Sequence, residues 1–131
     1  MRRYAGTMLA LLLAAATPVL AGDWLTDDHS AIVRIGPCGP ALCGRVVRVL
    51  SPGAPATDVN NPDPALRRRT IAGLPVLSDF MPAAGDFAGH AYDPKSGRSY
   101  RSALHLNANG TLRVTGCVAL ICRSRVWIRS R

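Results

Sequence analysis

Two pairs of cysteines with the same spacing, Cys38 with Cys43 and Cys117 with Cys122, place the strongest constraint on how this 131-residue chain can fold. Small exported domains commonly use cysteines in disulfides, because an oxidising compartment preserves the bond. A four-cysteine zinc site is the alternative, but such sites often use the closer spacing C-x2-C, whereas both pairs here are C-x4-C. We therefore predict structural disulfides and no metal site.

The first 21 residues indicate export. Two arginines follow Met1, an uncharged run extends from residue 4 to residue 20, and small residues precede Gly22. This is the pattern of a signal peptide cleaved after Ala21. A transmembrane anchor is less favoured, because Thr17 and Pro18 interrupt a run that is shorter than the roughly 20 residues of a spanning helix. We predict a signal peptide over residues 1–21 and a periplasmic or secreted domain over residues 22–131, with the formal charge reduced from +8 to +6 by loss of two arginines.

The mature chain has the pattern of an all-β protein. No segment after residue 21 sustains the apolar spacing of a long helix, and the chain has ten prolines and no glutamate. Short alternating runs bounded by turn residues occur instead. They lie at about residues 22–26, 31–35, 44–50, 71–77, 87–92, 99–106, 111–117 and 122–129. We predict a single antiparallel up-and-down β-barrel of about eight strands, with a two-sheet sandwich as the alternative.

The barrel order bears on the disulfide pairing. In an up-and-down barrel successive loops alternate between the two ends, so the loops that carry the two cysteine pairs fall at opposite ends. Bridged cysteines must have Cα atoms within about 7 Å of each other. We therefore favour local bridges, Cys38 with Cys43 and Cys117 with Cys122, over either crossed pairing.

These bridges raise a question about arginines in the lumen. If Cys38 faces Cys43, Arg48 lies opposite Val33 on an otherwise apolar face. If Cys117 faces Cys122, Arg125 lies opposite Val114. Either the lumen contains arginine, or a bulge near the last turn directs the arginines outward.

In the last strand Arg123, Arg125 and Trp127 share one face, and Trp127 lies opposite Leu112. A bulge at Gly116 would turn this face outward, because glycine beside a hairpin tip is a common bulge site. An inward arginine would need a partner, since an unpaired buried charge is very costly. The candidate partners are an anionic ligand, bound water, or the carboxylates of Asp79, Asp86 and Asp93.

The connection over residues 51–70 carries polar side chains whose chemistry has two interpretations. Asp58, Asn61 and Asp63 offer the oxygen ligands that calcium prefers, but their spacing does not match an EF-hand. Asx side chains that cap backbone turns are the favoured interpretation. Pairing of Asp63 with Arg67 or Arg69 would hold this loop over one mouth of the barrel.

Charge and motifs limit the classes of function. The run over residues 67–69 is three arginines, which is typical of a solvated face, with attraction to an anionic membrane surface as the functional alternative. Nucleic acid is not expected, because no aromatic residues are interleaved with the arginines. The chain has no G-x-S-x-G, H-E-x-x-H or phosphate-loop motif, and its histidines, His29, His90 and His105, are scattered. We expect no cofactor and assign no catalytic residue; an enzyme ranks third among the hypotheses.

Several spaced motifs resemble the small exported bacterial proteins grouped as domain of unknown function 2147. They are Gly22-x-Trp24, Cys38 with Leu42-Cys43-Gly44, Asp58-x-x-Asn61-Pro-Asp-Pro64, Arg67-x-Arg69-x-x-x-Gly73, Tyr92-Asp-Pro94-x-x-Gly97-x-x-Tyr100, Gly116-Cys117 and Cys122 with Trp127-x-Arg129. The resemblance covers nearly all of the mature chain. It implies a lipocalin-like, or calycin, barrel with no established activity. It also implies that Trp24 packs against Arg129 and joins the first strand to the last, a contact that guanidinium–indole stacking favours.

We predict that the barrel binds a small amphiphilic and possibly anionic molecule in its lumen. The residues assigned to this site are Arg48, Arg125, Trp127, Tyr92 and Tyr100. The alternative is an envelope interaction protein with a solid barrel core, whose loops contact a partner or anionic lipid. The volume of the lumen discriminates between the two hypotheses.

Overall fold

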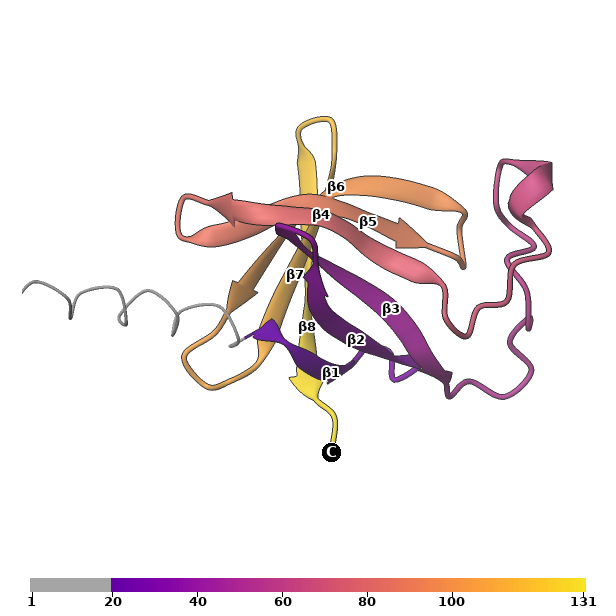
Figure 1. Cartoon of the computed structure of the whole chain (residues 1–131), viewed down its shortest axis with the longest axis horizontal. Helices are drawn as coiled ribbons and strands as arrows, with labels where there is room; N and C mark the ends of the chain where they lie inside the picture. The colour runs from indigo at the N-terminus through magenta and orange to yellow at the C-terminus, as the bar shows by residue number, and fades with distance from the viewer. Residues whose placement is uncertain (1–19) are drawn as a thin grey trace, which may run out of the picture.

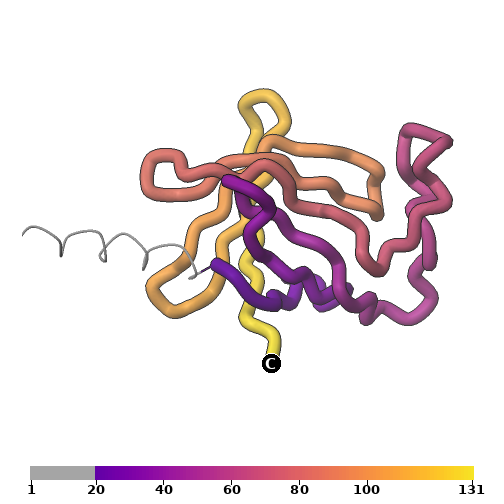
Figure 2. Tube along the Cα trace, viewed as in Figure 1, coloured from indigo at the N-terminus to yellow at the C-terminus, as the bar shows by residue number. Residues whose placement is uncertain are grey.

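The computed structural model describes residues 20–131, which form a closed barrel of eight antiparallel strands (Figures 1 and 2). Each strand pairs with the next along the chain, and β1 closes the barrel against β8. The strands are β1 Gly22–Leu25, β2 Ala31–Cys38, β3 Ala41–Val49, β4 Pro75–Ala83, β5 Asp86–Asp93, β6 Arg98–Leu106, β7 Leu112–Val118 and β8 Ile121–Arg129, and the 3-10 helix η3 Pro64–Leu66 lies between β3 and β4. The predicted up-and-down barrel is confirmed. The predicted signal peptide lies outside the described residues except for Leu20 and Ala21.

Within residues 20–131, no helix has the length and apolar character needed to cross a membrane.

The fourth strand begins later than predicted. The run over residues 71–77 was expected to be a strand, but β4 starts at Pro75 and continues to Ala83. Residues 71–74 form a turn whose Leu74 carbonyl accepts a hydrogen bond from Val46. Beyond the predicted end, the β4–β5 register shifts between Ser78 and Met81, and Asp79 has a positive φ of 58°. This bulge interrupts the apolar alternation, which is why the pattern ended too early.

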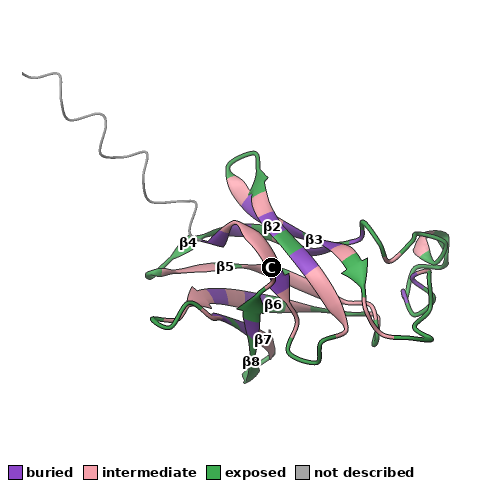
Figure 3. Ribbon diagram, turned by 90° about the horizontal axis from the view of Figure 1, so that it is seen from below, coloured by how far each residue is buried: buried purple, intermediate pink, exposed green. Residues whose placement is uncertain are grey.

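The two ends of the barrel differ. Buried residues are concentrated along the strands, whereas the turns and the long connection after β3 are mostly exposed (Figure 3). One end is closed by the largest buried side chains, among them Trp24, Phe80, Leu104 and Leu112. At the other end lie the β1–β2, β3–β4, β5–β6 and β7–β8 connections. The core therefore fills one half of the barrel and leaves the other half open to the loops.

Both predicted disulfides are present, and they lie at opposite ends of the barrel. Cys38–Cys43 lies at the β2–β3 turn and Cys117–Cys122 at the β7–β8 turn. Each bridge joins neighbouring antiparallel strands, so each fixes a hairpin and does not link distant parts of the chain. Two disulfides are compatible with an exported protein.

At the closed end, stacking of an arginine on a tryptophan ring joins the first strand to the last. The guanidinium of Arg129 lies 4.2 Å from the centre of the Trp24 ring, and these two residues are register partners. The Nη1 atom of Arg129 also donates a hydrogen bond of 2.7 Å to the carbonyl of Ala21. Gly22 has a φ of +127°, and a Cβ there would lie only 2.7 Å from the same Nη1. The positive φ therefore favours glycine here, and any larger residue would also displace this guanidinium.

A chain that begins at Gly22 is expected to be less stable than one that begins at Leu20. Leu20 is 4% exposed, and its carbonyl accepts a hydrogen bond of 3.0 Å from the Trp24 indole. Cleavage after Ala21 removes this buried side chain and two carbonyl acceptors, so we expect a loss of about 2 to 3 kcal/mol in the free energy of unfolding. Urea denaturation of the two purified chains measures the difference, and a chain with Leu20→Ala isolates the side chain. Equal midpoints would show that residues 20 and 21 do not stabilise the barrel.

Candidate functional site

A cavity of about 780 Å³ occupies the open half of the barrel. It extends from the lumen to the loops at the open end, and its volume lies within the range of roughly 300 to 1,000 Å³ that small-molecule sites span. Its deep wall is mainly apolar and is formed by Val33, Val46, Val76, Leu77, Val114 and Trp127. The alternation of side chains along β2, β3, β7 and β8 places the residues of those strands on the inner face. Val76 and Leu77 are adjacent in β4, where the β3–β4 register is irregular, and both line the cavity.

The last hairpin brings arginines to this cavity. The β7–β8 register runs without a shift, with Val114 opposite Arg125 and Gly116 opposite Arg123. The alternative of a bulge at Gly116 is therefore wrong. Arg123 and Arg125 both line the cavity, and the side chain of Arg125 is 63% exposed. Because they lie near the mouth, these charges remain in contact with water and do not carry the cost of full burial.

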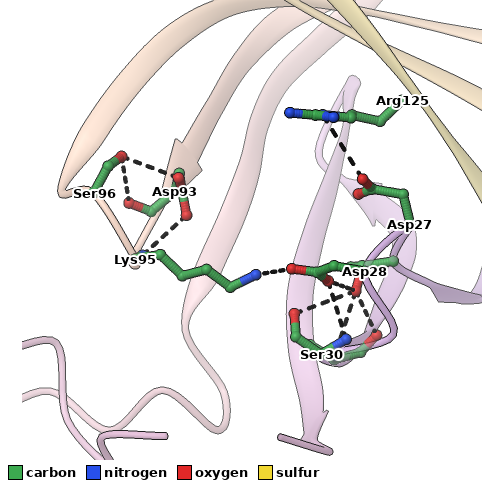
Figure 4. A network of polar contacts seen from close by, with 9 residues as sticks. Asp27, Asp28, Ser30, Asp93, Lys95, Ser96 and Arg125 are labelled. Carbon is green, nitrogen blue, oxygen red and sulfur yellow. Dashed lines mark hydrogen bonds and ion pairs between the residues drawn. The ribbon is translucent and has the colours of Figure 1, made fainter.

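The partner of Arg125 is Asp27 in the β1–β2 turn, with 3.7 Å between Nε and Oδ2 (Figure 4). None of the three carboxylates expected from the sequence pairs with it. Asp79 lies in the β4 bulge and Asp86 contacts His105 Nδ1 at 2.6 Å. Asp93 accepts hydrogen bonds from the Lys95 amide and the Ser96 hydroxyl within its own turn.

A second ion pair crosses the mouth of the cavity. Lys95 in the β5–β6 turn contacts Asp28 in the β1–β2 turn (Figure 4). The β1–β2 turn is itself ordered by Asp28, which accepts hydrogen bonds from Thr26 and from the Ser30 amide. The mouth therefore has fixed charges of both signs, contributed by loops that are far apart in the sequence.

The inward placement predicted for Arg48 is wrong. The β2–β3 turn pairs Cys38 with Ala41, so Cys43 lies opposite Gly36 and not opposite Cys38. A register shift next to Ile32 then places Arg48 opposite Ile32. Arg48 is exposed and borders a depression on the outer surface with Asp23 and Arg34. The bulge that was considered for the last hairpin occurs in the first hairpin.

The two predicted tyrosines have different surroundings. Both line the cavity. Tyr100 is the diagonal neighbour of Gly116, whose register partner on β6 is Ser102, and a Cβ at Gly116 would lie 3.7 Å from Tyr100 Cβ and Cγ. The hydroxyl of Tyr92 donates a hydrogen bond of 2.7 Å to Oδ1 of Asp58 in the long connection.

We call residues 51–74 between β3 and β4 the strap. It extends to one side of the barrel in Figure 2, and Asp58 in its centre is 0% exposed. Asp58 Oδ2 accepts hydrogen bonds from Asn61 Nδ2 at 2.9 Å and from Arg69 Nη2 at 3.3 Å. Together with Tyr92, these donors give the buried carboxylate three partners. The strap is therefore joined to β5 by a buried charge.

The expected pairing of Asp63 with Arg67 or Arg69 is not found. Asp63 Oδ1 instead accepts a hydrogen bond from the Ala65 amide and caps η3, and Asn61 Oδ1 accepts one from the Asp63 amide. These are the turn-capping roles of the favoured interpretation. Arg67 Nε donates to the Asn61 carbonyl at 2.7 Å. Arg67 and Arg69, two of the three consecutive arginines, therefore make hydrogen bonds within the strap while remaining exposed.

Residues 22–129 match the family described as "uncharacterized protein conserved in bacteria (DUF2147)". The chain belongs to this family. A similar solved structure is HP1028 of Helicobacter pylori, described as belonging to the lipocalin family, with a TM-score of 0.75, 22% identity, and coverage of 86% of this chain and 83% of that one. At this identity the likeness supports the barrel fold alone. Among curated proteins, none matches the chain.

The strap of this DUF2147 barrel forms part of the cavity wall. Asn60 Nδ2 donates to the carbonyls of Pro94 and Lys95 at 3.2 and 3.1 Å, which docks the strap on the β5–β6 turn. Gly97 in that turn has a φ of +73°, and a Cβ there would overlap the Asn60 carbonyl. Thr57, Val59 and Asn60 line the cavity. The position of the strap therefore determines the shape of the mouth.

The electrostatics of the Asp58 cluster favour an ionised carboxylate beside a neutral phenol. Burial alone would raise the pKa of Asp58, but hydrogen bonds from Asn61, Tyr92 and Arg69 outweigh it, so the pKa is lowered from its usual value. Burial and the hydrogen bond to Asp58 raise the pKa of Tyr92 to about 12. Both shifts stabilise the protonation states that form the Tyr92–Asp58 hydrogen bond at neutral pH.

Sequence reasoning missed Asp27, Asp28 and Lys95 at the mouth. Each lies in a short turn where a charged side chain is normally solvated, so composition gave no reason to select it. The signal that was available is topological: in an up-and-down barrel the β1–β2, β5–β6 and β7–β8 turns lie at the same end as the strap. Charged residues in those turns could have been grouped on that basis.

No group of His, Cys, Asp or Glu side chains within residues 20–131 is arranged to hold a metal ion. The side chains of Asp58, Asn61 and Asp63 are used in the hydrogen bonds described above.

Proposed function

We propose that this exported DUF2147 barrel binds a small amphiphilic anion, with its apolar part in the lumen and its anionic head at the mouth. The observation that carries this proposal is the cavity of 780 Å³, which is apolar in its depth and has arginines at its opening. Apolar surface supplies most of the free energy of binding at such sites, and a few polar groups fix the orientation. An arginine at the mouth supplies charge-assisted hydrogen bonds to a carboxylate or phosphate.

Arg125 is well placed for this role. Its ion pair with Asp27 uses Nε, and within residues 20–131 its two terminal nitrogens have no other ion pair or hydrogen bond. Arg123 also lines the cavity. It lies two residues closer to the tip of the hairpin than Arg125 and is on the same face of β8. A head group between them would receive donors from both side chains.

The alternative is an envelope interaction protein with a solid barrel core. The cavity in the lumen counts against a solid core. The cavity can admit an apolar chain between the closed-end core and the mouth. Contact with lipid through the loops is a separate question that does not depend on a solid core.

Replacement of Arg125 and Arg123 by methionine is expected to weaken binding of a fluorescent fatty acid by at least about tenfold. Methionine keeps an unbranched apolar side chain and removes the charge, and a hydrogen bond to a charged group is worth about 1.5 to 3 kcal/mol. Fluorescence titration of the wild type and of the double variant measures the loss. A fatty alcohol of equal chain length should show a smaller difference between the two proteins, because it lacks the anionic head.

Arg48→Met is the matched control, because Arg48 is exposed on the outer face and does not line the cavity. It should leave the affinity unchanged. Equal affinity in the wild type and the Arg123/Arg125 variant would contradict the role of the mouth arginines. Failure of the wild type to bind any acyl probe would contradict the proposed function itself.

A further inference from the structure

The tip of the β7–β8 hairpin is apolar and projects into solvent. Residues 118–121 read Val-Ala-Leu-Ile, and Leu120 is 98% exposed while Ile121 and Val118 are 71% and 54% exposed. Figure 1 shows this hairpin extending beyond the neighbouring strands. Ala119 has a positive φ of 54°, so the turn is tight, and the Cys117–Cys122 disulfide lies directly behind it. A single exposed leucine is ordinary, but four consecutive apolar residues at a projecting turn mark an interaction site.

The surroundings of the tip are positively charged. Arg101 on β6 donates a hydrogen bond of 2.6 Å from Nη2 to the carbonyl of Ala119, and Arg123 follows the disulfide on β8. The sequence contains no acidic residue after Asp93, so β6, β7 and β8 carry basic side chains and no carboxylate. The apolar tip is therefore presented by the part of the barrel with a wholly positive side-chain charge.

We propose that the β7–β8 tip inserts into the surface of an anionic lipid bilayer, with Arg101 and its basic neighbours against the head groups. Apolar side chains supply the insertion energy and basic residues add attraction to anionic lipid, a combination typical of peripheral membrane binding. A protein partner fits less well, because a stable interface covers about 800 Å² on each side and a two-residue turn offers much less. This proposal does not depend on a ligand in the cavity. Insertion of the tip would bring the mouth of the cavity close to the lipid surface.

Leu120→Ser tests the apolar contribution. Leu120 does not line the cavity, so the substitution separates membrane binding from binding in the lumen. We expect affinity for vesicles of equal parts phosphatidylglycerol and phosphatidylcholine to fall about tenfold, because the transfer of one leucine side chain is lost. Binding of the fatty acid probe should not change. Met81→Ser, at a residue exposed on β4, is the matched control and should keep vesicle binding intact.

Arg101→Gln tests the electrostatic contribution. One basic residue at an anionic surface contributes about fivefold in affinity, so this variant should bind the same vesicles about fivefold less tightly. Arg113→Gln is the control, since Arg113 is exposed on β7 at the other end of the hairpin. Vesicles of phosphatidylcholine alone should bind the wild type weakly, and added salt should weaken binding to the anionic vesicles.

The measurements use residues 20–131, which contain all eight strands and the buried core, because the apolar run before them would bind vesicles by itself. Co-sedimentation gives the affinities. A Leu120→Trp variant reports depth, since its fluorescence should shift to the blue and be quenched by brominated acyl chains. Unchanged vesicle binding by Leu120→Ser, or no binding by the wild type, would overturn the proposal. A dimer in ultracentrifugation that Leu120→Ser abolishes would instead assign the tip to a second copy of the chain.

Discussion

Replacing Gly116 with phenylalanine is expected to weaken binding of an acyl probe in the barrel by about a hundredfold. Gly116 lies on β7 and lines the cavity, and among residues 20–131 the one side chain within 4 Å of its Cβ position is Tyr100, at 3.7 Å. Its φ is not in the positive region, so a side chain is compatible with the backbone. A phenyl ring there would occupy the lumen beside Tyr100. Inserting bulk into a packed site costs about 1 to 3 kcal/mol, and a phenyl ring is at the large end of such insertions, so we expect affinity to fall by about a hundredfold.

Gly36→Phe provides the matched control for this experiment. Gly36 lies in β2 and does not line the cavity, and no atom of the described part of the chain lies within 4 Å of its Cβ position, leaving out its two chain neighbours. The same substitution there adds a ring outside the lumen, and the probe should bind as it does to the wild type. Thermal unfolding of both variants shows whether the barrel remains folded. If a folded Gly116→Phe protein binds the probe as tightly as Gly36→Phe does, the ligand does not occupy the lumen.

The two hairpins show which part of the fold could be predicted from cysteine spacing. Cys117 pairs directly with Cys122, so the register deduced from the bridge places Arg125 and Trp127 correctly. In the first hairpin the bridge is diagonal, with Cα atoms 5.9 Å apart compared with 4.0 Å in the second. Both geometries join cysteines five residues apart across a two-residue turn. Spacing alone therefore predicts the pairing of the cysteines but not the register of the strands.

The bulges and the docking of the strap could not be predicted from the sequence, because they depend on contacts between distant segments. Strand alternation is a local pattern, and it was sufficient for the number and order of the strands. The Asp58–Tyr92 contact joins residues 34 positions apart, and the sequence does not distinguish Asp58 from Asp63 as the buried member of the strap. Which acid is buried depends on how the strap docks on β5, and that depends on packing between segments distant in the sequence.

Replacement of Asp58 by alanine is expected to destabilise the protein by about 3 to 5 kcal/mol. The carboxylate is fully buried, and its loss leaves the donors of Tyr92, Asn61 and Arg69 without their acceptor. A donor left without its acceptor in a buried site costs about 1 to 3 kcal/mol, and Tyr92 and Asn61 are two such donors. Arg69 adds little to this cost, because its side chain is 40% exposed and can be solvated. Urea denaturation measures the change. The strap should also become more susceptible to limited proteolysis, since its connection to β5 is lost.

Asp63→Ala is the control for Asp58→Ala, because Asp63 lies in the same strap and caps only the short helix η3. Loss of a cap costs about 1 kcal/mol, so this variant should retain most of the stability and a protected strap. Equal destabilisation by the two substitutions would contradict the prediction that the buried Asp58 carboxylate holds the strap on β5.

The same cluster predicts how strap stability depends on pH. The folded-state pKa of Asp58 is lowered, so its contribution is present above the unfolded value of about 4 and is lost as the pH falls through the lower folded value. The pKa of Tyr92 is raised to about 12, so its contribution is complete below the unfolded value of about 10 and is lost as the pH rises toward 12. Urea midpoints should therefore decline between pH 10 and 12 in the wild type, by more than in Tyr92→Phe, which has no phenol to ionise at this position. A parallel decline in both proteins would show that Tyr92 does not couple ionisation to the docking of the strap.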